Sequence, residues 1–297
     1  MSPSRARSLL ARASIVAGAA GLVGGAAVGV VLVRDGTRAL TAWRRPPGSP
    51  AAFLRAGRAP GTHTVVVCIG DSITHGVASG SYVEPLRERL ERDGFAVVNG
   101  GINGNLAWNV LHRLDAVIAC RPDAVVLLVG TNDVLGTLGP GWESMYRQQQ
   151  HIPSTPAPDW FRATLAEILR RLAAETGARV AVLDLPPIGE DLGSATNDRV
   201  RAHNAIIREV AAEHGAALLP LHDGLVALLP PDHAPAPFDG TRRLMGAALV
   251  RRAVLRQPWG RISAANGLVL LTDGVHLNDR AAAVVADLVE GWLTTPA

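Results

Sequence analysis

Apolar residues follow two alternating patterns along this 297-residue chain from about residue 64 onward. Short runs rich in Val, Ile and Leu predict buried strands, and longer segments with apolar residues at helical spacing predict amphipathic helices. The predicted strands are 64–69, 96–99, 123–129, 179–184 and 216–220. The predicted helices are 81–93, 106–119, 159–176, 196–214 and a last one from 279. Such alternation predicts an α/β fold in three layers, a doubly wound parallel sheet with helices on both faces.

Two segments depart from this alternation. Residues 135–159 contain Trp142, Tyr146, three glutamines and several prolines, a composition that suits the lid or wall of a cleft. Plain surface packing is the alternative interpretation. Residues 230–265 contain a helical run from Leu244 to Leu255, with two arginine pairs in it or beside it.

The N-terminal region carries a separate signal. Ser14 to Val33 is a run of twenty uncharged residues with arginines on both sides. It is long enough to span a bilayer and longer than the usual apolar core of a cleaved signal peptide, so it is interpreted as an uncleaved transmembrane helix. Because Gly and Ala dominate the run, a cleaved leader or a soluble chain is the alternative. The predicted domains are a basic segment and anchor over 1–35, a linker over 36–63 and one domain over 64–297.

The charges around this run do not fix its orientation, because three arginines precede it and four follow closely. A short basic N-terminus before one apolar segment commonly directs export, so we expect the domain on the extracytoplasmic side. Gly21, Gly25 and Gly29 repeat every fourth residue, a spacing that permits helix–helix self-association but also arises by chance in such a sequence. Cys68 and Cys120 stand beside apolar sequence and are interpreted as buried thiols.

The net charge of +3 and the pI near 9.5 come from an excess of arginine, much of it in the first sixty residues. Attraction to an anionic membrane surface explains this charge more simply than nucleic-acid binding, because no nucleic-acid motif accompanies it.

Four short blocks of glycine and polar residues stand out within the domain. They are Gly70–Thr74, Gly101–Gly104, Gly130–Asp133 and Asp273–His276. Three of them follow predicted strands, where parallel α/β sheets carry their functional residues. Ser72 comes shortly after the apolar run Val65–Ile69, so its hydroxyl is expected where a buried strand ends. Together the blocks supply a nucleophile, hydrogen-bond donors, and a base with an acidic partner.

In their order and separations, these blocks resemble those of the SGNH hydrolases, the GDSL-type esterases and lipases. The resemblance implies a flavodoxin-like SGNH hydrolase fold. It also implies that Ser72 is the nucleophile, His276 the base and Asp273 the carboxylate that orients the base. The backbone N–H groups of Ser72 and Gly104 and the side-chain amide of Asn132 would then form the oxyanion hole.

The chemistry explains why these residue types are needed. A serine hydroxyl is a poor nucleophile at neutral pH unless a positioned imidazole takes its proton. A carboxylate at the other imidazole nitrogen fixes the tautomer and stabilises the imidazolium. Attack on an ester carbonyl creates an alkoxide, and loss of one donor to it typically costs about 3 to 4 kcal/mol of transition-state stabilisation.

The resemblance extends over roughly residues 64 to 293, with one departure in the second block. The family usually has Asp after the block's last glycine, whereas this chain has Asn105, which leaves the local hydrogen bonding open. Gly101 competes with Gly104 for the oxyanion role.

Each assignment also has a purely structural alternative. Serine is also a common helix cap, so Ser72 can be interpreted as the cap of the following helix. Asparagine is common in turns, so Asn132 can be interpreted as a turn residue. The Asp273–His276 block is also typical of a turn before the last helix, with Asn278 or Asp279 as the N-cap of that helix. The two interpretations of this block are compatible.

The neighbouring titratable residues are given other roles. Asp71 and Asp133 are interpreted as structural hydrogen-bonding groups, and His75 as a residue of the cleft wall that is a candidate for substrate contact. The G-x-G-x-x-G spacing of dinucleotide loops, a G-x-S-x-G elbow, H-E-x-x-H and paired C-x-x-C are absent from the sequence. We therefore expect no cofactor and no metal.

The sequence favours a membrane-tethered serine esterase or lipase that acts on carboxylic esters, in acyl lipids or acetylated saccharides. Acyl transfer to an alcohol would use the same residues, so the sequence does not separate it from hydrolysis. A catalytically silent membrane or binding module is the remaining alternative. The complete set of blocks argues against it.

Overall fold

The computed structural model describes residues 46, 48–76, 79–235, 238–240 and 243–295. By its internal contacts the chain divides into two units, Met1–Arg44 and Arg45–Ala297. The predicted anchor, Ser14–Val33, lies outside the described residues. None of the helices formed by the described residues combines the length and the apolar character that crossing a bilayer would take.

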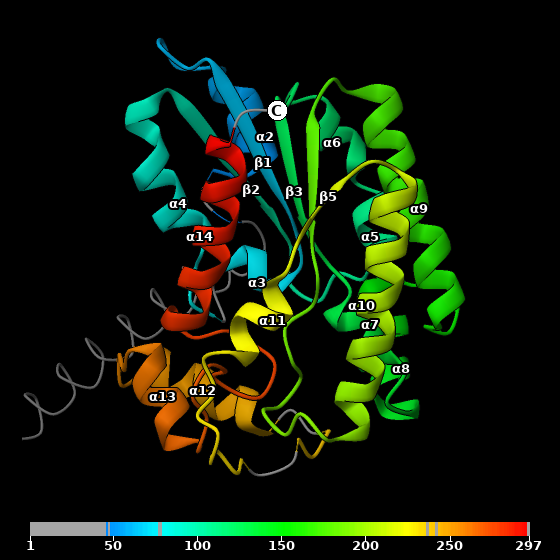
Figure 1. The fold of residues 1–297 in the computed structure, drawn as a ribbon, viewed down its shortest axis with the longest axis vertical. Helices are drawn as coiled ribbons and strands as arrows, with labels where there is room; N and C mark the ends of the chain where they lie inside the picture. Colours follow the sequence, from blue (N-terminus) through cyan, green and yellow to red (C-terminus); the bar gives the residue numbers. More distant parts are fainter. Residues whose placement is uncertain (1–45, 47, 77–78, 236–237, 241–242, 296–297) are drawn as a thin grey trace, which may run out of the picture. The chain divides into compact units, whose positions relative to one another are not determined.

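A five-stranded parallel sheet forms the centre of the second unit (Figure 1). Its strands are β1 Thr64–Gly70, β2 Phe95–Gly101, β3 Ala124–Leu128, β4 Arg179–Leu183 and β5 Ala217–Leu219. They lie in the order β2-β1-β3-β4-β5, the flavodoxin-like order, in which the winding reverses between β1 and β3. Ligands of open α/β sheets bind at the carboxyl ends of the strands beside such a reversal. The region after β1 is therefore where this sheet order predicts a ligand site.

Helices precede, separate and follow the strands. They are α2 Pro50–Ala56, α3 Ser72–His75, α4 Val83–Leu90, α5 Ala107–Leu111, α6 Leu114–Ile118, α7 Thr131–Gly136, α8 Pro140–Gln150, α9 Pro158–Glu175, α10 Ala195–Glu213, α11 Leu221–Val226, α12 Arg243–Ala253, α13 Trp259–Ala265 and α14 Asp279–Thr294, with a short 3₁₀ turn, η1, at Glu91–Asp93.

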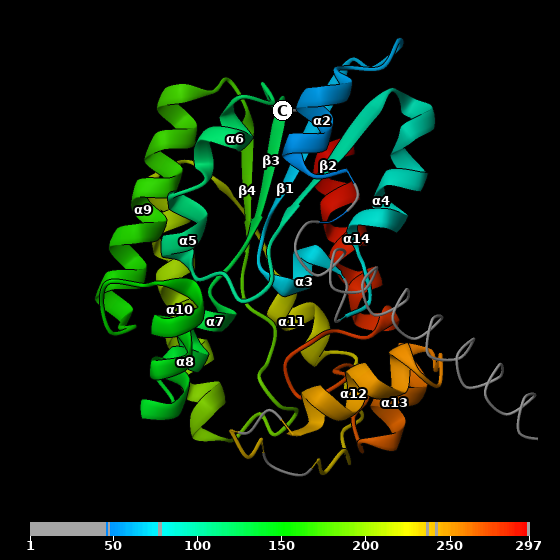
Figure 2. The same cartoon turned by 180° about the vertical axis from the view of Figure 1, so that it is seen from behind.

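Both faces of the sheet are buried, and alternate residues of β1 belong to different cores. Val65 and Val67 point into a core shared with α5, α9 and α10, whereas Val66 and Cys68 point into a core shared with α4 and α14. Figures 1 and 2 show these two groups of helices on opposite faces of the sheet. The predicted α/β/α layering and all five predicted strands are confirmed.

Three differences between the structure and the predicted elements stand out, beside short helices that were not predicted, such as α7 and α11. The single helix predicted over 106–119 is broken into α5 and α6, at the point where Arg113 turns its side chain toward the end of β1. The segment 135–159, predicted to be irregular, contains α8, which starts at a proline and buries Trp142 and Tyr146 one turn apart. Within the predicted linker, Pro50–Ala56 forms α2.

Cys68 and Cys120 are free thiols and both are buried, as predicted. Burial raises the pKa of the Cys68 thiol to about 12 and that of the Cys120 thiol to about 11. Neither is therefore a reactive thiolate at neutral pH.

Candidate active site

The turn from β1 to α3 presents Ser72 at the carboxyl edge of the sheet. The Asp71 carboxylate caps α3, because its Oδ1 accepts the Ile73 N–H at 2.9 Å. A β-carbon at Gly70 would overlap the carbonyl oxygen of Leu128 on the neighbouring strand β3. Glycine is therefore required at Gly70, and Asp71 has the structural role predicted for it.

Gly101, at the end of β2, supports α3 from the other side. A β-carbon there would overlap the backbone nitrogen of His75, the last residue of α3. The Gly101 N–H donates to Asn99 Oδ1 at 3.0 Å, so this donor is already engaged. The side chain of His75, predicted to line a cleft wall, is only 3% exposed.

Ser72, His276 and Asp273 form one continuous line of hydrogen bonds. His276 Nε2 lies 2.9 Å from Ser72 Oγ, and His276 Nδ1 lies 2.8 Å from Asp273 Oδ2. The second carboxylate oxygen of Asp273 accepts the backbone N–H groups of Val275 and His276. All three side chains are buried. With the Nδ1 proton directed at Asp273, Nε2 is free to accept the serine proton.

The two titratable members of this line shift each other's pKa in opposite directions. Burial alone would raise the pKa of Asp273, but the charge of His276 and the hydrogen bonds that Asp273 accepts outweigh burial and lower it. Burial likewise opposes the charged form of His276, but the Asp273 carboxylate outweighs it and raises the pKa of the imidazole. The pair therefore favours a carboxylate next to an imidazole that is readily protonated.

The loop that carries Asp273 and His276 is held by another carboxylate, that of Glu190. Glu190 is buried, and its two oxygens accept the backbone N–H groups of Val269, Leu270 and Leu271 at 2.7 to 3.1 Å. Its Oε2 also lies 2.6 Å from Nε2 of His233. These bonds fix the segment immediately before Asp273.

Glycines bring a second contact to the same loop. The Gly189 N–H donates to the carbonyl oxygen of Gly274 at 2.6 Å. The ring of Phe238 lies over Gly274, where a β-carbon would come within 2.9 Å of it and where φ is +89°. Farther along, Asn278 accepts the Ala281 N–H and is the N-cap of α14, so of the two predicted candidates, Asn278 and Asp279, the structure has Asn278. The Asp273–His276 block is thus both part of a capped turn and part of the line of hydrogen bonds.

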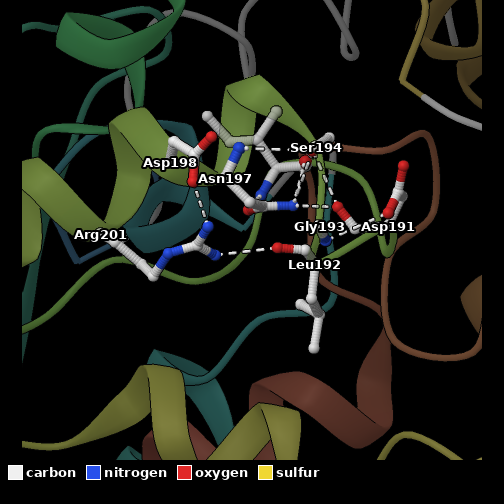
Figure 3. A network of polar contacts seen from close by, with 8 residues as sticks. Asp191, Leu192, Gly193, Ser194, Asn197, Asp198 and Arg201 are labelled. Atoms are coloured by element: carbon white, nitrogen blue, oxygen red, sulfur yellow. Dashed lines mark hydrogen bonds and ion pairs between the residues drawn. The ribbon is translucent and has the colours of Figure 1, made fainter.

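Residues at the start of α10 hold the turn Asp191–Gly193, which directly follows Glu190 in the chain (Figure 3). The Asn197 side chain donates to the carbonyl oxygens of Ile188 and Asp191 and accepts the Ile188 N–H. Ser194 Oγ donates to the same Asp191 carbonyl at 2.8 Å. The position of His276 therefore depends on contacts that extend as far as the first turn of α10.

Asn132 lies opposite this loop, in the first turn of α7. Its Nδ2 donates to the Asn105 carbonyl at 2.9 Å and to Asp71 Oδ2 at 3.3 Å. The Tyr146 hydroxyl donates to its Oδ1 at 2.6 Å. Because Tyr146 occupies the oxygen, the amide NH₂ is directed toward the Asp71–Ser72 turn.

The loop after β2 is held by Gln150, the last residue of α8. Gln150 Nε2 donates to the Asn103 carbonyl at 3.3 Å, and its Oε1 accepts from Asn105 Nδ2 at 3.1 Å. Between these residues Gly104 adopts a φ of +74°, and a β-carbon there would lie 2.6 Å from Gln150 Nε2. Glycine therefore suits this position for two separate reasons.

Asn105 stands where the resemblance led us to expect Asp, and its contacts account for the amide. Its Oδ1 accepts from Arg113 Nε at 2.8 Å, while its Nδ2 donates to Gln150. An aspartate would accept from the arginine but has no hydrogen to donate to Gln150 Oε1. The departure thus matches a local network that needs one acceptor and one donor.

Buried ionisable side chains adjoin this network. Arg113 donates to the Gly70 carbonyl at 2.7 Å, and its burial lowers the pKa of the guanidinium to about 10. Burial raises the pKa of Asp71 to about 6, against the hydrogen bond from Ile73 and the charge of His276. Burial also raises the pKa of Asp133 to about 8, and its Oδ2 accepts the Ala107 N–H at the start of α5. Asp133 therefore has the structural role predicted for it.

Sequence reasoning found the residues of the four blocks and missed three that hold them. Arg113 falls in a predicted helix and Glu190 in a predicted connection, with no motif around either. Gln150 falls in a segment that the sequence distinguishes only by its composition. Within the described residues, no group of three His, Cys, Asp or Glu side chains is placed to hold a metal ion.

Comparison with known proteins places this geometry in a family. The profile of the GDSL-like Lipase/Acylhydrolase family matches residues 68–284. No curated protein matches the chain. Among solved structures, the acetyl xylan esterase AlAXEase is 22% identical with a TM-score of 0.54, and the match covers 77% of this chain and 99% of that one.

Two other solved structures are similar in fold. Axe2, an acetylxylan esterase from Geobacillus stearothermophilus, is 18% identical with a TM-score of 0.52, over 79% of this chain and 96% of that one. LAE5, an alpha/beta hydrolase enzyme from the metagenome of Lake Arreo, is 21% identical with a TM-score of 0.50, over 79% and 97%. The family profile covers most of the chain and all four blocks, so this chain belongs to the GDSL-like lipase/acylhydrolase family and is a hydrolase that acts on ester bonds.

Proposed function

We propose that this protein is a serine esterase or lipase that hydrolyses carboxylic esters through Ser72, His276 and Asp273. The observation that carries the proposal is the continuous line from Ser72 Oγ to His276 Nε2 at 2.9 Å and from His276 Nδ1 to Asp273 Oδ2 at 2.8 Å. It places a nucleophile, a general base and an orienting carboxylate in the order that the reaction needs.

In the first step Ser72 Oγ attacks the ester carbonyl carbon while its proton passes to His276 Nε2. The C=O π electrons move to the carbonyl oxygen, which becomes an alkoxide. The nearby Asp273 carboxylate stabilises the imidazolium formed at this moment, in agreement with the raised pKa of His276. When the intermediate collapses, His276 returns the proton to the leaving alkoxide, and an acyl-serine remains.

We assign the oxyanion hole to the backbone N–H groups of Ser72 and Gly104 and to the side-chain amide of Asn132. The choice of Gly104 over Gly101 rests on the Gly101 N–H, which already donates to Asn99. The Asn132 amide already faces the serine turn, and its 3.3 Å bond to Asp71 is long enough to be exchanged for a shorter one to the oxyanion.

The second half of the reaction releases the acyl group. A water molecule loses a proton to His276 Nε2 as its oxygen attacks the acyl carbonyl carbon, and collapse of the second intermediate returns the proton to Ser72 Oγ. The products are a carboxylic acid and the free enzyme.

Two classes of ester suit the proposal, acylated lipids and acetylated saccharides. Two of the structural neighbours are acetylxylan esterases by name, which makes short acetyl esters of saccharides the first substrates to test. A series of esters of graded acyl length, assayed with the same preparation, separates the two classes.

A fluorophosphonate probe tests the nucleophile. Because His276 activates Ser72, we expect covalent labelling at Ser72 alone, lost in Ser72→Ala and strongly slowed in His276→Ala. Ser263, a second buried serine, provides a matched control, since Ser263→Ala should leave labelling intact. Labelling that persists in Ser72→Ala would sink the assignment.

We further propose that residues 1–35 tether the domain to a membrane and that residues 36–63 link it, with the domain on the extracytoplasmic side. The support is the uncharged run of residues 14–33 between arginines. Deletion of residues 1–35 should release an active soluble domain, because all four blocks lie beyond residue 64. If the full-length chain, with its N-terminus intact, fractionates as a soluble protein, the tether is wrong.

A further inference from the structure

Exposed apolar side chains are concentrated on α12 and the two residues that follow it. Within the part of the chain that the structure describes, five large apolar side chains are exposed, and four of them lie here. They are Leu244 at 36%, Val250 at 59%, Val254 at 59% and Leu255 at 60% exposure. We call these four residues the α12 patch.

The inward side of α12 packs against the domain, and of the patch only Leu244, one turn before Ala248, lies on this side, where it lines a cavity. Ala248 is buried against Trp259 and Ile262 of α13, and Met245 packs against the core under α9 and α10. Val250 lies on the side of α12 away from Ala248, and Val254, which follows the helix, lies one turn farther along, where its N–H donates to the Val250 carbonyl. Packing within the domain does not account for the exposed apolar side chains of Val250 and Val254.

The sequence around the patch is strongly basic. From Asp239 to Asp273 there are six arginines, and the two aspartates at its ends are the acidic residues of this stretch. Asp239 lines the cavity beside α12, together with Arg243 and Arg251. Arg251 donates to the amide oxygen of Asn266, and Arg252 donates to the Gln257 carbonyl. Both contacts are with neutral groups, so neither cancels the positive charge.

Another adjacent pair of arginines, on α9, is placed differently. Arg170 pairs with Glu167, and Arg171 pairs with Glu175 and Asp115. Arginines on α9 thus face carboxylates of the same chain. The contrast indicates that Arg251 and Arg252 suit an anionic partner outside the chain.

We propose that the α12 patch docks on an anionic phospholipid bilayer. A helix with exposed aliphatic side chains between arginines suits the boundary between lipid headgroups and acyl chains, where both parts find their preferred surroundings. A second copy of the chain fits less well. A two-fold contact through this face would bring arginine against arginine with no carboxylate in the segment between them.

Docking through this face brings the candidate active site to the lipid surface. A cavity of about 370 Å³ separates α12 from the catalytic loop, and its lining includes Leu244 and Ala247 of α12, Phe238 and Gly274. Gly274 stands between Asp273 and His276 in the chain. Figures 1 and 2 show α12 and α13 beyond the same end of the sheet as α3. The docking itself does not rest on catalysis by Ser72.

A fluorophore at position 250 tests the proposal on the full chain. Because Cys68 and Cys120 are buried, a thiol-reactive, polarity-sensitive dye can be directed to Val250→Cys and, as a control, to Ala173→Cys on α9. The labelled chain is reconstituted with vesicles of phosphatidylcholine alone or with about one third phosphatidylglycerol, a composition that gives a negative surface. Quenching by a lipid-attached quencher then reports which position reaches the bilayer.

We expect strong quenching at position 250 in anionic vesicles, weaker quenching in zwitterionic vesicles, and little at position 173 in either. Arg251→Gln with Arg252→Gln should shift the docking equilibrium by about 30-fold, since each lost charge weakens attraction to the surface about fivefold. The matched pair Arg170→Gln with Arg171→Gln, which removes the same charge from α9, should leave quenching unchanged.

Three outcomes would overturn the proposal. Equal quenching at positions 250 and 173 would mean that the patch does not reach the bilayer. Equal quenching in both kinds of vesicle, insensitive to the arginine variants, would remove the anionic surface as the partner. A concentration-dependent dye response without vesicles would point to a second copy of the chain instead. Ser72→Ala should dock like the parent chain, which separates this test from the proposed catalysis.

Discussion

The serine side and the histidine side of the site are held in place by different means. Ser72 follows β1, which is paired along its length with β2 and β3, so the sheet's backbone sets its position. His276 lies in a loop outside the sheet. Its regular backbone pairing is one isolated bridge, Leu271 to Leu277. The Glu190 carboxylate also holds this loop, because it accepts the backbone N–H groups of Val269, Leu270 and Leu271.

This difference indicates where single substitutions should act. Backbone pairing on both sides of β1 does not depend on any one side chain, so the serine turn should tolerate side-chain changes around it that leave Gly70 and Gly101 in place. The histidine loop depends on a few side-chain acceptors that are distant in sequence. One remote substitution can therefore move the base relative to the nucleophile while the sheet stays intact.

The largest expected effect tests the electrostatics of the histidine side. Asp273→Asn keeps an oxygen for the N–H groups of Val275 and His276, but it turns an amide NH₂ toward Nδ1 and imposes the wrong tautomer. We expect kcat to fall by about 10⁴-fold, the loss that this substitution causes in serine proteases, with little change in Tm. Steady-state kinetics and thermal melting measure the two. Near-normal kcat in Asp273→Asn would remove the carboxylate from the mechanism.

The next largest effect lies on the serine side. Asn132→Ala removes one oxyanion donor and should lower kcat by roughly 10²- to 10³-fold with KM little changed. Tyr146→Phe is the matched control for orientation, because it keeps the donor and removes only the hydroxyl that fixes the amide. It should cost less than Asn132→Ala. An unchanged kcat in Asn132→Ala would assign Asn132 to a turn role.

A smaller effect is expected from Glu190, which never contacts the reacting atoms. Glu190→Gln replaces one acceptor oxygen by an NH₂ that faces backbone N–H groups, a loss of about 1 to 3 kcal/mol for a buried donor left unpaired. Misplacement of His276 should lower kcat roughly 10- to 100-fold and slow fluorophosphonate labelling by a similar factor.

The exposed Glu209 on α10 provides a matched control for that substitution. Glu209→Gln removes only a surface contact with Arg162 and should leave both rates unchanged. If Glu190→Gln lowers Tm while kcat and the labelling rate stay at the parent values, the histidine loop does not depend on Glu190 in the way described.

The smallest effect is a shift of the pH profile. His276 must be neutral to accept the serine proton, and its pKa is raised above the usual 6.5. kcat/KM should therefore rise with pH along a single acid limb whose midpoint lies above about pH 6.5, and stay high toward pH 9. Asp71 adds to the raised pKa through its charge, so Asp71→Asn should move the limb to lower pH. A flat profile down to pH 4.5 would remove His276 as the base.

The sequence predicted the regular part of the molecule because that part repeats locally. Alternating apolar runs located all five strands, and the blocks beside them located Ser72, Gly104 and Asn132 at the carboxyl ends. Strand and helix periods reflect burial on one side or both, which neighbouring residues in the chain reveal. The Asp-x-x-His block was found for a similar reason, since its two side chains are three residues apart.

Only the tertiary structure decided which residues hold that chemistry in place. Arg113 reaches Gly70 across 43 positions of sequence, and Glu190 reaches Leu270 across 80. The helix predicted over 106–119 is interrupted where the Arg113 side chain reaches the Gly70 carbonyl. α8 forms in a segment rich in polar residues and proline because Trp142 and Tyr146 pack into the hydrophobic core. Such contacts join a side chain to whichever backbone the fold brings near, and they leave no period or motif in the sequence. The chain's own pattern thus determined the sheet and the reacting groups, while long-range packing determined the shell that positions them.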